Sequence, residues 1–139
     1  MNSVIKNILA VILGLAIGSI VNMGIITISG SVIPPPEGVD PTSMQSLKET
    51  MHLFRPKHYL MPFLAHALGA FVGAFVASVI AKKSKLKMAL IVGVLFLIGG
   101  VINVFMLPSP IWFAVLDIAV AYLPMAWFGY KLSENFTKK

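Results

Sequence analysis

The stretch YLMPFLAHALGAFVGAFVASVIA, residues Tyr59–Ala81, decides what kind of fold this chain can adopt. It contains one ionisable side chain, His66, and it is long enough to cross a bilayer as a helix, which takes about 20 apolar residues. Small residues recur along it at every fourth position: Ala65, Gly69, Gly73, Ala77 and Ala81. Because a face of Gly and Ala lets another helix approach closely, we expect the other helices to pack on this segment.

Three further segments are almost free of charged residues and are similar in length. The four expected spans are about 5–28, 59–81, 87–107 and 111–131, with a loop over 29–58. A content of 58% hydrophobic and 12% charged residues excludes an ordinary soluble globule, in which about 25% of residues are charged. The runs are apolar on all sides, which disfavours a β-barrel. The sequence therefore predicts an all-α membrane protein in one integral membrane domain, 1–139: a four-transmembrane-helix bundle of two tandem hairpins.

The basic residues gather at helix ends, which indicates an orientation in the membrane. With the N-terminus in the cytoplasm, the cytoplasmic side holds Lys6, Lys82, Lys83, Lys85, Lys87, Lys131, Lys138 and Lys139. The opposite side holds Lys48, Arg55 and Lys57 together with Glu37, Asp40 and Glu49. This positive-inside pattern predicts that both termini are cytoplasmic. Orientation in the lipid bilayer also explains the net charge of +6, so we expect no nucleic-acid partner.

The loop over 29–58 contains the only candidate helix outside the spans. Pro34–Pro36 favours an extended segment, and Asp40 followed by Pro41 is typical of a helix start, with Asp40 as the N-cap. Apolar residues then recur at helical spacing up to Phe54. The pattern predicts a short amphipathic helix on the outer membrane surface, or alternatively a lid over a site.

The first span carries a second series of small residues, Ala10, Gly14 and Gly18, and Asn22 continues the same face. We expect Gly14 and Gly18, with Gly69 and Gly73 of the second span, to serve helix packing. In the fourth span, Pro124 is expected to kink a continuous helix.

An internal repeat relates the two halves of the chain. IGSIVNM (17–23) matches IGGVINV (98–104), and LAHALGAF (64–71) matches VLDIAVAY (115–122) more weakly. A parallel repeat of this kind would place a pseudo-twofold axis along the membrane normal. The alignment pairs Asn22 with Asn103 and His66 with Asp117. All four residues lie about 7–10 Å below the outer ends of their spans at the rise of a helix.

This polar layer is the candidate binding site. An acid within a span is costly unless it is paired, neutral or hydrated, so Asp117 should face inward, with His66 as its partner. One interpretation is that these side chains only join helices. The other is a site, open to the outer face, for a proton, a cation or a small polar solute.

Other chemistry finds little support in the sequence. The chain has no cysteine, and His52, His58 and His66 lack the spacing of a metal site, so no metal or cofactor is expected. Nucleotide-binding and hydrolase motifs are absent as well. We therefore expect no catalytic residue and no enzymatic activity.

The segment PPPEGVDP (34–41), followed by HALGAFVGAFVA (66–77), resembles a group of small four-span bacterial membrane proteins. In that group a Pro-rich outer loop precedes a span that reads L-G-x-F-x-G-x-x-x-A. The resemblance covers the first half of the chain best. It implies a multi-pass protein of the bacterial inner membrane, and it carries no catalytic residue across.

Two functions follow as hypotheses. The first is a protein that acts by helix–helix association, either as an accessory subunit of a larger membrane complex or as a homo-oligomer, because the small-residue series exceed what one bundle needs. The second is an oligomeric small transporter or channel that uses Asn22, His66, Asn103 and Asp117.

Overall fold

The computed structural model describes residues 2–138, so Lys139, which was assigned above to the cytoplasmic side, lies outside the described residues. Every regular element in this range is a helix. The elements are α1 (Ser3–Val32), α2 (Met44–Thr50), η1 (Met51–Leu53), η2 (Pro56–Tyr59), α3 (Leu60–Ile80), α4 (Lys85–Met106), α5 (Ile111–Val120) and α6 (Leu123–Thr137).

Within residues 2–138, four helical stretches are long and apolar enough to cross a membrane: Ser3–Val32, Pro56–Ile80, Lys85–Met106 and Ile111–Thr137. Each overlaps one of the spans expected from the sequence. The first continues to Val32 instead of ending near residue 28, so the long loop begins about four residues later than predicted.

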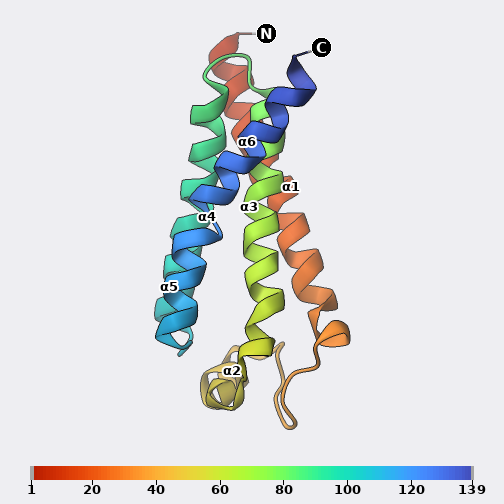
Figure 1. Cartoon of the computed structure of the whole chain (residues 1–139), viewed down its shortest axis with the longest axis vertical. Coiled ribbons are helices and arrows are strands. Elements are labelled where there is room, and N and C mark those ends of the chain that lie inside the picture. Colours follow the sequence, from red (N-terminus) through yellow and green to blue (C-terminus); the bar gives the residue numbers. More distant parts are fainter. Residues whose placement is uncertain (1, 139) are drawn as a thin grey trace.

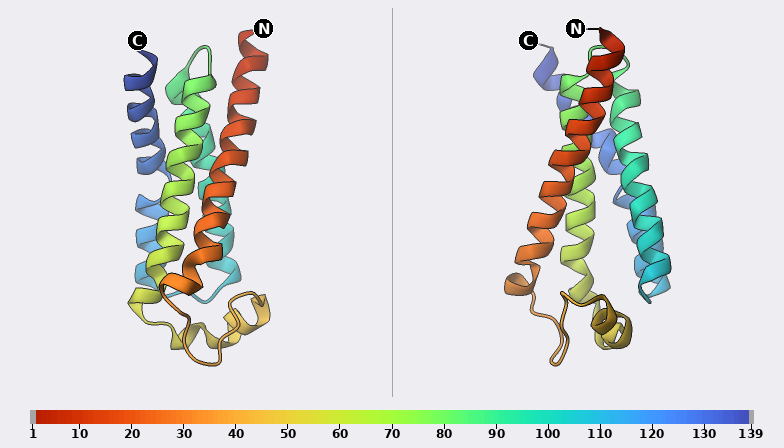
Figure 2. Two further views of the ribbon diagram at one scale, coloured as in Figure 1. Left: turned by 90° about the vertical axis from the view of Figure 1, so that its right-hand side faces the viewer. Right: turned by 180° about the vertical axis from the view of Figure 1, so that it is seen from behind.

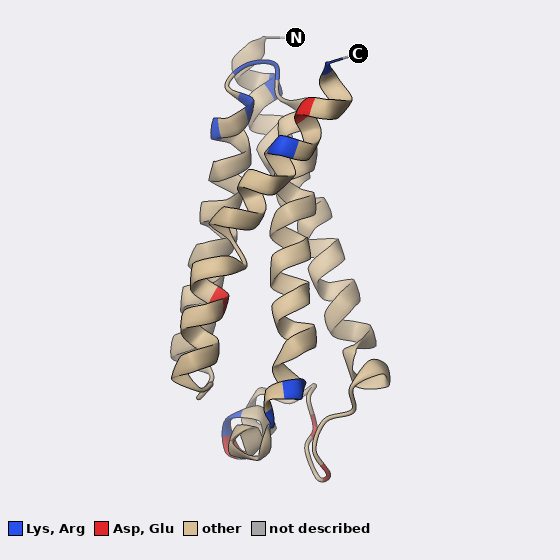
Figure 3. Ribbon diagram, viewed as in Figure 1, with Lys and Arg blue, Asp and Glu red and all other residues tan. Residues whose placement is uncertain are grey.

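The long helices lie side by side, and α3 contacts α1, α4 and α6 (Figures 1 and 2). Both ends of the described chain and the turn between α3 and α4 lie at one end of the molecule, which we call the terminal end. The long loop, α2 and the turn between α4 and α5 lie at the other, which we call the loop end. Much of the Lys and Arg gathers at the terminal end (Figure 3).

Small residues bring α1 and α6 close to α3 along what we call the packed seam: Ala10, Gly14 and Gly18 of α1, Gly69, Gly73, Ala77 and Ser78 of α3, and Gly129 and Ser133 of α6. A Cβ added to Gly14 would lie 2.5 Å from the carbonyl oxygen of Gly73, and one added to Gly18 would lie 2.6 Å from that of Gly69. These distances leave no room for a side chain, so glycine sets the separation of α1 and α3.

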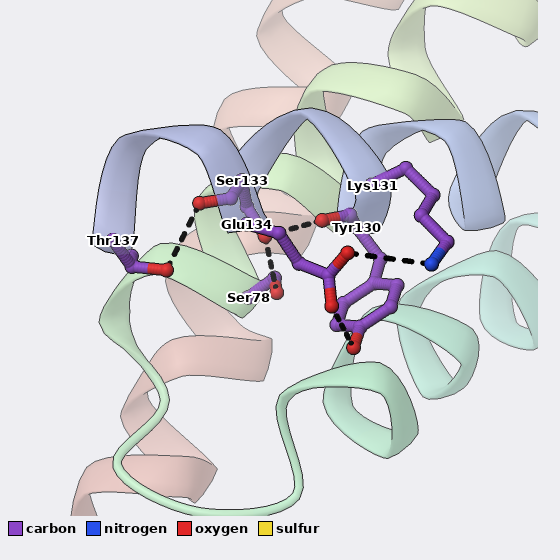
Figure 4. A network of polar contacts seen from close by, with 6 residues as sticks. All are labelled: Ser78, Tyr130, Lys131, Ser133, Glu134 and Thr137. Atoms are coloured by element: carbon purple, nitrogen blue, oxygen red, sulfur yellow. Dashed lines mark hydrogen bonds and ion pairs between the residues drawn. The ribbon is translucent and has the colours of Figure 1, made fainter. Parts of the chain in front are cut away.

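A serine pair joins α3 to α6 towards the terminal end (Figure 4). Ser78 Oγ lies 2.7 Å from Ser133 Oγ, and both side chains are fully buried. Ser133 donates its own proton to the carbonyl oxygen of Tyr130 at 2.6 Å, so Ser78 is the donor within the pair. On the same turn of α6, the Tyr130 hydroxyl donates to Glu134, which also pairs with Lys131.

The fourth span is not the continuous kinked helix that we expected. It breaks at Ala121 and Tyr122 into α5 and α6, just before Pro124. Proline has no N–H, so it cannot continue the hydrogen-bond ladder of α5, and α6 begins there with its proline in the first turn. The predicted counterpart of this span, α3, is unbroken from Leu60 to Ile80, so the break has no equivalent in the other half of the repeat.

The loop helix also starts later than predicted. Ser43, not Asp40, is the N-cap of α2, and its hydroxyl accepts a hydrogen bond from the backbone N–H of Ser46. The carboxylate of Asp40 instead accepts hydrogen bonds from the backbone N–H and the hydroxyl of Thr42, and these bonds hold the pKa of Asp40 below its usual range. Asp40 is thus engaged in a local turn and is not available to cap a helix.

Candidate functional site

The candidate site centres on a hydrogen-bonded histidine–aspartate pair between α3 and α5, which is an ion pair when His66 is protonated. His66 Nδ1 lies 2.9 Å from Asp117 Oδ1 and 3.0 Å from Asp117 Oδ2. Residue 66 is seven positions from Tyr59, and residue 117 is six positions from the start of α5, so both side chains lie at a similar distance from the loop end. The structure therefore brings together two of the four polar residues of the predicted layer.

Tyr122 adds a third group to this pair. Its hydroxyl donates to Asp117 Oδ2 at 3.0 Å, and its ring stacks on His66 with 5.9 Å between centroids. On a continuous helix, a residue five positions after Asp117 would point about 140° away from it. The break at Ala121 and Tyr122 is therefore what returns the tyrosine to the carboxylate.

A glycine of α4 provides the room for this tyrosine. A Cβ added to Gly100 would lie 2.5 Å from Cζ of Tyr122. Any side chain at residue 100 would therefore displace the ring on which His66 stacks. Because Tyr122 itself is almost fully buried, the ring has little space to move into.

The carboxylate of Asp117 is satisfied from within the chain. The residue is 3% exposed, and both oxygens accept hydrogen bonds, from His66 and from Tyr122. A buried acid requires such partners because charge is poorly solvated away from water. To donate to the carboxylate, His66 must carry a proton on Nδ1, and its other ring nitrogen, Nε2, then accepts or donates according to its own protonation.

The ion pair forms part of the wall of a cavity of about 220 Å³ at the loop end, which we call the loop-end cavity. The rest of its wall comes from the end of α1, the long loop, and α3, α4 and α5, and most of its side chains are apolar. Leu47 of α2, Met51 of η1 and Phe54, which follows η1, contribute to its wall from the long loop. The loop that we expected on the membrane surface or over a site thus contributes directly to this cavity.

A second, more open cavity of about 320 Å³ also has His66 in its wall. Asn22, Asn103 and Tyr122 line it together with His66. His66, Gly100 and Asn103 line both cavities, so the two cavities adjoin at these residues. Asn22 is half-buried and Asn103 is exposed, and within residues 2–138 neither side chain makes a hydrogen bond.

The structure thus places the other three predicted residues in cavity walls that include His66, but it joins only His66 and Asp117 directly. Gly14, Gly18, Gly69 and Gly73, which the sequence assigned to helix packing, lie together in the packed seam. Among the described residues no group of three or more His, Cys, Asp or Glu side chains lies close enough to hold a metal ion.

Two tyrosines of the site were missed from the sequence. From the sequence, Tyr122 was noted only as part of the internal repeat, and Tyr59 only as a residue near the end of an expected span. A tyrosine inside an apolar span needs a partner for its hydroxyl, which was a usable signal for Tyr122. That signal could not name Asp117 as the partner, because the contact depends on the break in the helix.

No protein-family model matches this chain, and neither curated proteins nor solved structures show detectable similarity to it. The resemblance to small four-span bacterial proteins therefore stays a prediction, and the function has to be argued from the site.

Proposed function

We propose that the chain is a small multi-pass protein of the bacterial inner membrane, folded as a four-helix bundle with both termini in the cytoplasm. Its loop end then faces outward. The gathering of lysines at the terminal end supports this orientation, because positive charge favours the cytoplasmic side. The loop-end cavity would be reached from the outer face or from the outer leaflet of the membrane.

Within this topology, the function that the geometry supports best is binding and transfer of a proton, a cation or a small polar solute. The observation that carries the proposal is the buried Asp117 carboxylate, held by His66 and Tyr122 in the wall of a cavity. An ionisable pair at membrane depth is costly, and such pairs are typical of proton and solute pathways. The proposal assigns no catalytic activity to the chain.

Each residue has a separate role in this proposal. Asp117 holds the imidazole of His66 and fixes which nitrogen carries the proton. His66 presents its other nitrogen to a solute or accepts a proton from it. Tyr122 orients the carboxylate, and Asn103, which lines both cavities, offers an amide to a solute in either one.

Transfer across the membrane would require more than one chain. Towards the terminal end, α3 packs against α1 and α6 through small residues, and this leaves little space for a solute. Asn103 is exposed at membrane depth, where an amide without a partner is costly. A homo-oligomer could provide a path for the solute between its chains and could cover the amide of Asn103.

Helix–helix association remains the second candidate, and one observation favours it. Gly24, Gly30 and Gly99 have open space where a Cβ would be, so among residues 2–138 no neighbouring helix packs closely against them. They could serve contact with another protein. The seam glycines no longer support this function, because they pack against each other inside one chain.

A flux assay on proteoliposomes tests the proposal. We expect proton uptake, reported by a trapped pH-sensitive dye under an imposed potential, to exceed that of protein-free vesicles and to be lost in Asp117→Asn and in His66→Ala. Glu134→Gln makes the same acid-to-amide change on α6 away from the cavity and should leave the flux unchanged. Unchanged flux in Asp117→Asn, together with lower thermal stability, would favour the association hypothesis.

A further inference from the structure

The connection between α3 and α4 gathers lysines that the fold leaves free. It reads KKSKLK, residues 82–87, which we call the basic turn, and within residues 2–138 none of its lysine side chains forms a hydrogen bond or an ion pair. Of the five acidic residues of the chain, only Glu134 lies towards the terminal end, and it already pairs with Lys131. The positive charge of the basic turn is therefore available to attract an anion.

A side chain of α1 holds the basic turn in place. Asn7 Oδ1 accepts hydrogen bonds from the backbone N–H groups of Lys82 at 3.1 Å and Lys83 at 3.5 Å. Its Nδ2 donates to the carbonyl oxygen of Lys83 at 3.0 Å. These bonds use only the backbone of the two lysines, so their side chains remain free. Because the backbone is already ordered, less conformational entropy is lost when the lysines bind an anion.

An apolar groove of about 570 Å³ runs along α4 from the basic turn. Two rows of side chains with a spacing of four residues border it: Leu86, Leu90 and Val94 in one row, and Lys87, Ile91 and Leu95 in the other. Its two polar residues, Ser84 and Lys87, both lie at the end beside the basic turn, and the others are aliphatic. The groove thus combines a charged end with an apolar body.

The length of the groove matches one leaflet of a membrane. Ser84 and Leu95 are eleven positions apart, which is about 16 Å at the rise of a helix. The hydrocarbon core of a bilayer is about 30 Å thick, so one leaflet provides about 15 Å of it. With the basic turn at headgroup level, the aliphatic rows of the groove follow the hydrocarbon of the leaflet at the terminal end.

The charge pattern favours a lipid over a second copy of the chain in this groove. A symmetric contact through the same face of α4 would bring the basic turns of both copies together, and like charges repel. A phospholipid with an anionic headgroup instead offers a negative charge to the lysines and an acyl chain to the aliphatic rows. A zwitterionic phospholipid carries the same chain, but its headgroup has no net charge.

We propose that the basic turn and the groove of α4 together bind one anionic phospholipid from the leaflet at the terminal end. Its phosphate lies beside Lys83, Ser84 and Lys87, and one acyl chain lies between the two aliphatic rows. This lipid site is separate from the candidate site at the loop end, and it does not depend on the transport proposed there.

Fluorescence quenching by brominated lipids tests the site, because it reports which lipid contacts a chosen tryptophan. The native tryptophans are first removed as Trp112→Phe and Trp127→Phe. In this background, Ile98→Trp places a reporter on α4 one helical turn beyond Val94, outside the groove itself. Ile20→Trp places a control reporter on α1, and both positions are exposed.

The two reporters are matched in depth. Ile98 lies thirteen positions after Lys85, and Ile20 lies thirteen positions after Asn7, which binds the backbone of the basic turn. The protein is reconstituted in mixtures of phosphatidylglycerol and phosphatidylcholine with identical chains, and one of the two lipids is brominated in each experiment. The ratio of the two quenching curves gives the preference for phosphatidylglycerol at each reporter.

At Ile98→Trp we expect a preference for phosphatidylglycerol of about tenfold, whereas Ile20→Trp should show none. Lys83→Gln and Lys87→Gln should each lower the preference about threefold to fivefold, the contribution of one lysine near a membrane surface. Lys138→Gln removes the same charge at the end of α6 and should leave the preference unchanged.

Val94→Phe fills the groove without a change in charge. We expect it to lower the preference at the Ile98→Trp reporter as much as Lys87→Gln does, because the acyl chain loses its place between the two rows. Val115→Phe makes the same substitution at an exposed position of α5 and should have no effect.

An equal preference at both reporters, or none at either, would overturn the lipid site. A preference that survives both Lys83→Gln and Lys87→Gln would overturn the assignment of the headgroup to the basic turn. A preference that falls in the lysine variants but is unchanged in Val94→Phe would overturn the groove as the position of the acyl chain.

Discussion

The packed seam and the loop-end cavity lie along the same helix, α3, and differ in the size of the residues that α3 presents. Along the seam, every fourth residue of α3 is Gly or Ala, and α1 comes close enough for a Cβ on Gly14 to meet the Gly73 carbonyl at 2.5 Å. Near the loop end, η2 and the first turns of α3 present Tyr59, Met61 and His66 instead, and a cavity of about 220 Å³ remains beside them.

This difference shows how residue size along one helix separates a structural region from a candidate site. Small side chains let the neighbouring backbones approach until no space remains. Large and polar side chains hold the neighbours apart, and the ribbons of α4 and α5 diverge from α3 towards the loop end (Figures 1 and 2). The residues of the long loop then close the resulting space from outside.

The largest effect is expected when the seam is forced apart. Gly14→Ala places a methyl group against the Gly73 carbonyl oxygen, which cannot move without shifting α3. We expect the free energy of unfolding to fall by about 1–3 kcal/mol, as for an overpacked core. Thermal or denaturant unfolding in detergent measures it. Gly24→Ala, on the same helix with open space at the Cβ, should change little, and equal losses at both positions would contradict the role of the seam.

A smaller effect is expected from the ion pair of the candidate site. His66→Ala and Asp117→Asn should each destabilise the protein, and the double variant should lose less than the sum. A double-mutant cycle should give a coupling energy of about 0.6–1.7 kcal/mol, as for interhelical hydrogen bonds in membranes. The surface pair Lys131 and Glu134 provides the control cycle, where we expect a smaller coupling energy because water screens the two charges. Equal coupling in the two cycles would remove the distinction between them.

The serine pair of the seam should contribute less again. Ser78→Ala removes the hydrogen bond to Ser133, but Ser133 keeps its bond to the Tyr130 carbonyl. We expect a loss of about 0.6 kcal/mol in unfolding free energy, the typical value for such a contact in a membrane protein. Ser19→Ala, at an exposed position of α1, is the control and should have no effect. A loss above that of Gly14→Ala would reverse the order of the two contacts.

The smallest effect concerns the loop that closes the cavity. The pKa of Asp40 is lowered by its bonds with Thr42, so these bonds stabilise the turn at pH values above the ordinary pKa of about 4 and are lost as the pH falls through the lowered value. Thr42→Val removes the hydroxyl and should raise the pKa of Asp40 in an NMR titration. No change would mean that the backbone N–H alone lowers the pKa.

The sequence was sufficient to predict the four long helices and to predict that Asp117 needs a partner inside the bundle. It was less reliable where local signals competed. Asp40 followed by Pro41 is a common helix start, yet Ser43 caps α2, because the side chain of Asp40 is already bound to Thr42. Pro124 predicted a disturbance in the fourth span, but its position did not reveal a full break two residues earlier.

The candidate site could be predicted only in part for a related reason. His66 and Asp117 stand out because ionisable groups are rare in apolar spans. Tyr122 does not stand out in this way, and its contact with Asp117 depends on the break after α5 and on the space at Gly100. The hydroxyl of Tyr59 has no hydrogen-bond partner among residues 2–138, and this is visible only once the neighbouring side chains have been placed.

By itself, the sequence determined which segments are helices long and apolar enough to span a membrane, because that free energy is a sum over residues within each segment. It also determined which side chains are too polar to face lipid. Only the tertiary structure decided that the seam glycines are used within one chain and that Asp117 has two partners. It also decided that a cavity remains at the loop end, because packing depends on the shapes of helices far apart in the chain.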